Sequence, residues 1–253
     1  MPYRLALPVA AALLVAACSG ADDRPASDQT APMSGPTAAP TESHVTPSPN
    51  PYLDRSVTFR ARQLLSAART GNGEKIALLI DAGAALETRD TDGRTPLLVA
   101  VTNDRVDAAR VLVAAGADPD ALDNRHDTPW LVTGVTGSVD MARVLLDADP
   151  DLTIRNRFGG ISIIPASERG HAEYVEYVLD TTDTAVDHVN DLGWTALLEA
   201  VILGQGTEPW QDIVESLIKH GADVSIADRD GITALRHARR LGYSEIARML
   251  ERA

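Results

Sequence analysis

The stretch Asp92–Ala100, with the sequence DGRTPLLVA, recurs along the C-terminal three quarters of the chain. Imperfect copies occupy residues 127–131, 193–198 and 231–235, and a degenerate copy occupies 159–164. A fixed period near 33 residues indicates a solenoid built from one small supersecondary unit. The position of Gly93 in the first copy, called the register position below, recurs at intervals of 33, 33, 34 and 38 residues. The residues at this position are Gly93, His126, Gly159, Gly193 and Gly231.

Each copy predicts two short helices. Thr95 can cap the first helix through its hydroxyl, and Pro96 suits the first helical position because its missing N–H would have no partner there. A break at Asp104 precedes a second helix, which Gly116 can end in a left-handed conformation. The polar segment between Gly116 and the next copy predicts an extended, hairpin-like loop. The apolar positions of this second helix are Val106, Ala109, Val111 and Leu112.

These features resemble the ankyrin repeat, whose pattern is Gly-x-Thr-Pro-Leu-His-x-Ala-Ala-x-x-Gly-His, a second helix and then Gly-Ala-Asp. Gly-Ala-Asp is intact at 116–118 and 221–223. The resemblance covers residues 57–253 and implies an all-α ankyrin-repeat solenoid of about six helix-loop-helix units with extended hairpin-like loops. The expected units are 57–91, 92–124, 125–157, 158–191, 192–229 and 230–253.

Residues 1–17 have the pattern of an export signal. Arg4 supplies the positive charge, and the 13-residue apolar run from Leu5 to Ala17 is shorter than the roughly 20 residues that span a membrane. Residues 15–18, Val-Ala-Ala-Cys, resemble a bacterial lipobox, in which Cys18 becomes the lipidated first residue. The alternative is an ordinary secretory signal that happens to contain Cys18. The lipobox implies an extracytoplasmic protein of the cell envelope, anchored by lipid to the cell membrane.

The segment 18–56 predicts a disordered tether behind the lipidated Cys18. Ser19–Ser56 hold seven Pro, four Thr and six Ser among 38 residues, with almost no large apolar side chains. Such a composition cannot bury a core. The tether is either a stalk that lifts the solenoid from the membrane or an inert linker. Because Cys18 is the only cysteine, we expect neither disulfides nor a thiolate zinc site.

Charge and motifs argue against several functions. The chain has 23 basic and 36 acidic residues and a formal net charge of −13, whereas phosphate backbones require a basic face. An acidic protein also does not adhere to an anionic bilayer, so we expect membrane attachment to depend on the lipid attached to Cys18. The six His show no metal-ligand spacing, and the common nucleotide, nucleophile and zinc motifs are missing from the sequence. We therefore expect a non-enzymatic monomer without cofactor or metal, and no nucleic acid partner.

Three irregularities stand out within the repeats. Trp130 takes a leucine position and is expected in the core. Unit 158–191 lacks Thr-Pro, either through drift or because its loops are remodelled for a partner. Unit 192–229 carries about five extra residues within Gln205–Gln211, which we expect in a loop between its two helices.

The resemblance also implies where a partner would bind. In ankyrin arrays the loop tips and the exposed side of each first helix form a concave face that contacts proteins. Carried onto this chain, the expected contact patch is centred on Phe158, Trp194 and Trp210. The alternative is that Trp210 packs its insertion back onto its own unit. The other expected partner-binding residues are Leu192, Ile202, Leu203, Arg157 and Arg229.

The resulting functional hypothesis is a protein-protein interaction module displayed outside the cytoplasmic membrane. The alternatives are an inert architectural spacer of the envelope and an accessory or inhibitor protein of a secreted enzyme or toxin. A buried Trp210 with a uniformly polar concave face would favour the spacer, and a large exposed apolar patch would favour the binder. The identity of the partner is not encoded in any motif.

Overall fold

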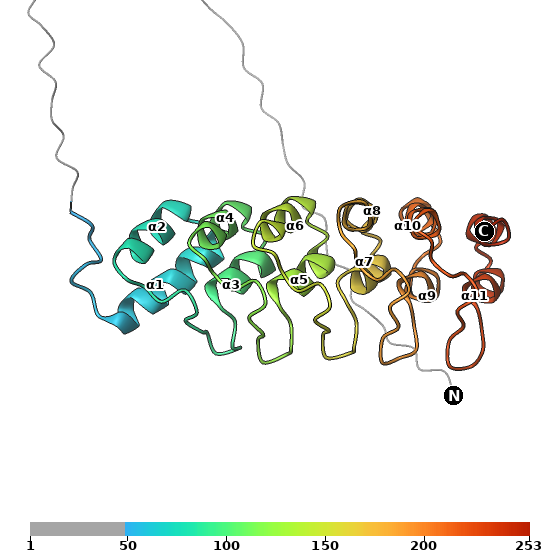
Figure 1. The fold of residues 1–253 in the computed structure, drawn as a ribbon, viewed down its shortest axis with the longest axis horizontal. Coiled ribbons are helices and arrows are strands. Elements are labelled where there is room, and N and C mark those ends of the chain that lie inside the picture. Colours follow the sequence, from blue (N-terminus) through green and yellow to red (C-terminus); the bar gives the residue numbers. More distant parts are fainter. Residues whose placement is uncertain (1–48) are drawn as a thin grey trace, which may run out of the picture. The chain divides into compact units, whose positions relative to one another are not determined.

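The computed structural model describes residues 49–253, which fold into twelve helices arranged as six pairs (Figure 1). The all-α solenoid expected from the repeat is confirmed. The predicted signal, Cys18 and most of the predicted tether lie outside the described residues. The helices are α1 (Val57–Thr70), α2 (Gly73–Asp81), α3 (Pro96–Thr102), α4 (Val106–Ala114), α5 (Pro129–Thr136), α6 (Val139–Leu146), α7 (Ile163–Arg169), α8 (Ala172–Thr181), α9 (Ala196–Ile202), α10 (Glu208–Lys219), α11 (Ala234–Leu241) and α12 (Ser244–Leu250).

The helices form two parallel rows, as Figure 1 shows. Each odd-numbered helix contacts the next odd-numbered one, from α1 to α11, and the even-numbered helices stack in the same way. The hairpin loops project from the side of the odd-numbered row. The core lies between the rows and consists mainly of Ala, Leu, Ile and Val. Small side chains let the helices of neighbouring units approach closely, so one core runs through the whole described region.

Threonine caps start most of the odd-numbered helices, as predicted. The Thr95 hydroxyl accepts a hydrogen bond from the amide of Leu98, and Thr128, Thr195 and Thr233 make the same bond in their units. The start of α7 differs because Ser162 makes no side-chain cap. Pro165 is the third residue of α7 and is tolerated there, since amides of the first turn have no partner within the helix.

A close backbone approach joins the irregular fourth unit to the third. A Cβ atom built on Gly134 would lie 1.9 Å from the carbonyl oxygen of Ser162, so only glycine fits there. Beside it, the buried hydroxyl of Tyr174 lies 2.7 Å from Thr133 Oγ1, and burial raises the pKa of Tyr174 to about 12. Trp130 is 1% exposed, which confirms its place in the core. The irregular sequence of this unit is therefore compatible with tight packing.

The insertion in unit 192–229 is not an extended loop. Residues 208–211 form the first turn of α10, which has 12 residues where α4 has 9. This turn directs Trp210 inward, where its indole Nε1 donates to Glu168 O at 3.2 Å. A Cβ atom on Gly170 or Gly204 would approach the ring to within 2.9 or 2.4 Å. Trp210 is only 9% exposed, and it packs against Glu168 and Gly170 of the preceding unit as well as Gly204 of its own, which differs from the alternative of packing onto its own unit.

The last residues of the predicted tether are attached to the first unit. Asn50 Nδ2 donates to Leu78 O at 2.7 Å and to Asp81 Oδ2 at 3.1 Å. Tyr52 packs against the core cluster. This contact differs from the expectation of a free tether up to residue 56. Composition alone missed it because the attachment depends on a few individual side chains rather than on an apolar run.

Candidate functional site

A repeated side-chain bond shapes every hairpin loop. In the fourth unit, Asn156 Oδ1 accepts from the amides of Phe158 and Gly160 at 2.9 and 3.0 Å. Gly159 between them has a φ of 71°, and His126 adopts φ 63° at the same register position despite its side chain. This bond holds one residue at the tip of each loop. The five tip residues are Asp92, Arg125, Phe158, Leu192 and Asp230.

Neighbouring loops are joined edge to edge, which fixes the spacing of the tips. The amide of Asn124 donates to Asp92 O at 3.0 Å, and the amide of Asp191 donates to Phe158 O at 2.9 Å. The Arg229 guanidinium continues the series by donating to Asp191 O. These bonds make the row of tips one wall of a groove, and the inner sides of α3, α5, α7 and α9 form the other.

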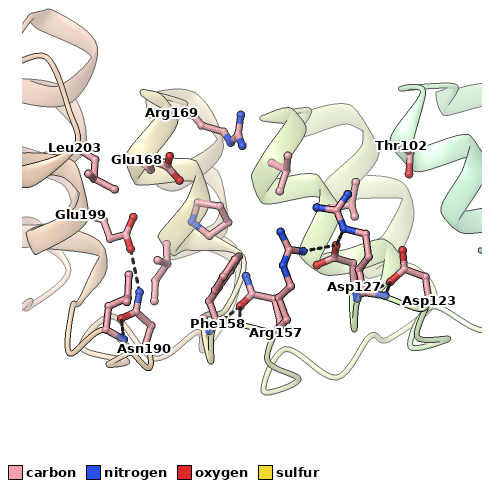
Figure 2. A pocket seen from close by; sticks show the side chains of 18 of the residues that line it. Thr102, Asp123, Asp127, Arg157, Phe158, Glu168, Arg169, Asn190, Glu199 and Leu203 are labelled. Carbon is pink, nitrogen blue, oxygen red and sulfur yellow. Dashed lines mark hydrogen bonds and ion pairs between the residues drawn. The ribbon is translucent and has the colours of Figure 1, made fainter. Parts of the chain in front are cut away.

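The groove contains a cavity of about 480 Å³ in its second to fifth units (Figure 2). Its apolar wall includes Phe158, Leu192 and Leu203, which are 51%, 49% and 46% exposed. Val132, Val135 and Ile164 also line it. The first and last tips are acidic, so the apolar loop tips, Phe158 and Leu192, lie in the middle of the row.

Arg157 holds Phe158 in place. Its guanidinium lies 4.4 Å from the centroid of the Phe158 ring, and its Nη1 lies 3.6 Å from Asp127 Oδ2. Arg125 approaches the same carboxylate at 3.9 Å. Burial and the nearby charge of Asp123 raise the pKa of Asp127, and the two arginines partly offset this rise. A cation on an exposed ring contributes about 0.5–1 kcal/mol, enough to bias the ring orientation.

Comparison with known proteins identifies the repeat. A family model described as "Ankyrin repeats (3 copies)" matches residues 64–156, 130–228 and 163–252. The chain belongs to the ankyrin repeat family. It is 36% identical over 186 residues to the putative ankyrin repeat protein YahD of Escherichia coli K12, covering 74% of this chain and 92% of YahD.

Solved ankyrin structures have the same fold. An ankyrin repeat domain from Acinetobacter baumannii is 44% identical with a TM-score of 0.71, covering 74% of this chain and 95% of that domain. The ankyrin repeat domain of Bcl-3, a member of the IkappaB family, is 29% identical with a TM-score of 0.67, covering 75% of this chain and 85% of that one. Ankyrin repeats are general protein interaction modules, and members of the family are typically non-enzymatic.

The ankyrin groove contains only part of the expected contact patch. Phe158, Leu192, Leu203 and Arg157 line the cavity. Trp194 and Ile202 are half-buried against the core, Arg229 is bound to the neighbouring loop, and Trp210 is buried. Of the three aromatic residues at the centre of the expected patch, only Phe158 therefore lines the cavity. The physical reason is the extra helical turn of α10, which turns the Trp210 ring toward Gly170 and Gly204.

The sequence reasoning missed Glu199. It lies on α9 and is 5% exposed, and its Oε1 accepts from Asn190 Nδ2 at 2.9 Å. Burial, followed by the charge of Glu168, raises the pKa of Glu199 to about 7. A signal was present, because this position, four residues after the capping threonine, holds Val99 and Val132 in earlier repeats. It was overlooked because acidic residues were attributed to loops and caps.

His171, which follows Gly170, has a structural contact, since its Nε2 lies 3.2 Å from Val135 O. Among residues 49–253, no group of His, Cys, Asp or Glu is arranged to hold a metal ion. None of the helices within that same range combines the length and apolar character needed to cross a membrane.

Proposed function

We propose that this ankyrin protein is a non-enzymatic binding module that captures a protein partner in the groove around Phe158. The observation that carries the proposal is the exposure of Phe158, Leu192 and Leu203 around one cavity. Exposed apolar clusters bordered by polar residues mark interaction surfaces. The tips on either side, Arg125 and Asp230, supply such a polar border.

The groove is suited to binding because its walls are already ordered. Side-chain and backbone bonds hold each loop tip, and Arg157 holds the Phe158 ring. Fewer side chains then lose freedom when a partner binds, so more of the contact energy appears as affinity. A mere spacer would not need apolar side chains at the tips. The apolar tips therefore favour a binder over an inert spacer, although Trp210 is buried.

We further propose that the module is displayed outside the cytoplasmic membrane by a lipid on Cys18. The support is the sequence alone: the lipobox-like residues 15–18 end an apolar run that begins at Leu5, and a Pro/Ser/Thr-rich segment comes next. Placed this way, the groove would meet partners of the envelope or secreted proteins. A role as accessory protein or inhibitor of a secreted enzyme or toxin is compatible with this location.

The test is capture of a partner by the full chain from detergent-solubilised envelope of the source organism. The bait is compared with the double variant Phe158→Ser/Leu192→Ser and with Leu78→Ser. Leu78 is a matched control because it is 40% exposed but lies on α2 in the other helix row. We expect the double variant to lose the captured protein and the control to retain it, with circular dichroism unchanged. Equal recovery by all three baits contradicts the proposal.

A further inference from the structure

One end of the groove presents acidic groups without a basic partner. Glu199 Oε1 accepts from Asn190, but its second carboxylate oxygen forms no hydrogen bond within residues 49–253. The residue is nevertheless 95% buried, since only 5% of it is exposed, and it lines the cavity. Glu168 on α7 lines the same end, and it forms no ion pair with any described residue. Figure 2 shows both carboxylates near Leu203.

The arginines of the groove are mostly paired elsewhere. Arg157 and Arg125 both lie against Asp127, and Arg157 also covers Phe158. Arg94, at the other end of the cavity, lies 2.8 Å from Asp90 Oδ2. Among the arginines that line the cavity, only Arg169, the last residue of α7, has no ion pair within residues 49–253, and it is exposed. Within residues 49–253, neither Glu168 nor Glu199 forms an ion pair.

The carboxylates of Glu168 and Glu199 together favour the binding of a cation. Burial and the charge of Glu168 both disfavour the ionised form of Glu199, which is why its pKa is raised. A positive group placed between the two carboxylates would offset both effects, and its attraction would be stronger there than in bulk water. Lysine and arginine supply N–H donors that a carboxylate accepts in short, charge-assisted bonds. The apolar side chains of Leu203, Leu192 and Phe158 line the same cavity.

We propose that the groove binds an extended segment of a partner protein in which a lysine or arginine adjoins a bulky apolar residue. The cation lies between Glu168 and Glu199, and the apolar side chain packs against Phe158, Leu192 and Leu203. The net charge of −13 favours the approach of such a basic segment. This inference rests on the proposed function, because it specifies the chemistry of a partner that occupies the same groove.

The experiment uses a phage-displayed library of random dodecapeptides selected on the immobilised full chain. We expect the selected peptides to be enriched in Lys or Arg next to Leu, Ile, Phe or Met. A synthetic selected peptide is then titrated against the wild type, Glu168→Gln/Glu199→Gln, Phe158→Ala and the control Glu215→Gln. Glu215 is exposed on α10 and does not line the cavity. The double glutamine variant should raise Kd about tenfold or more, as expected for hydrogen bonds to charged groups. The control should leave Kd unchanged.

The outcomes separate this inference from the proposed function. Peptides that require Phe158 but show no basic enrichment, or whose Kd is unchanged in the double glutamine variant, overturn the basic partner and leave the groove as a binding site. Selection of acidic peptides would also overturn the basic partner and leave the groove as a binding site. If no selected peptide depends on Phe158, the proposed function fails as well. Displacement by a synthetic peptide of residues 19–48, or self-association abolished by Phe158→Ala, would assign the groove to this chain and overturn the inference.

Discussion

Replacing Glu199 by glutamine should stabilise the protein at pH 8.5 and leave its stability at pH 5 nearly unchanged. The folded-state pKa of Glu199 is raised from 4.5 to about 7, so the folded protein holds its proton more tightly than the unfolded chain does. Stability linked to this proton is fully present below pH about 4.5 and is lost as the pH rises through about 7. Glutamine keeps an oxygen that accepts from Asn190 Nδ2, and it cannot ionise. The variant therefore does not lose this part of its free energy of unfolding as the pH rises.

The magnitude follows from the size of the pKa rise. At about 1.36 kcal/mol per pKa unit, a rise from 4.5 to about 7 sets an upper bound of about 3 kcal/mol. Because the second carboxylate oxygen borders a groove that water can enter, we expect roughly 1–2 kcal/mol. Removing the charge of Glu168 should recover part of this loss in the wild type, since that charge is the second cause of the shift.

The assay is urea unfolding at the two pH values, followed by tryptophan fluorescence. Trp130 and Trp210 are 1% and 9% exposed, so unfolding changes their surroundings strongly. Glu215→Gln is the matched control, because it removes one exposed negative charge from α10. We expect its unfolding midpoint to shift equally at both pH values. If the wild type and Glu199→Gln lose stability in parallel between pH 5 and pH 8.5, the reasoning about the buried carboxyl is wrong.

Three further predictions concern packing and location. Gly134→Ala should lower the free energy of unfolding by roughly 2 kcal/mol or more in urea unfolding, because its new Cβ would overlap the Ser162 carbonyl oxygen. The control Gly73→Ala meets only ordinary contacts, so its free energy of unfolding should stay within about 0.5 kcal/mol of the wild type. Trp210→Ala should cost about 3–5 kcal/mol by the same measurement, and a change below about 1 kcal/mol would show that the ring is not part of the core. Cys18→Ser should move the protein from the membrane to the soluble fraction of fractionated cells, and retention in the membrane would argue against a lipid anchor.

The groove illustrates why some site residues could be identified from the sequence and others could not. Phe158 and Leu192 were found because the register places them at loop tips, and every tip is set by the same local side-chain bond. Trp210 was misplaced because the insertion lengthened α10 by a turn instead of lengthening a loop. The register indicated a buried position for Glu199, since Val99 and Val132 occupy it in earlier repeats, but its hydrogen bond to Asn190 and its packing beside α7 involve groups outside its own helix.

The sequence by itself determined the helix pairs, their threonine caps and the period that stacks them, because those features depend on contacts within one repeat or between identical positions of adjacent repeats. Only the tertiary structure decided that the Trp210 ring is buried and which groups surround the Glu199 carboxyl. Those outcomes depend on non-repeating contacts between units, such as Trp210 against Gly170 and Glu199 beside Glu168. A periodic pattern carries no information about contacts that occur once.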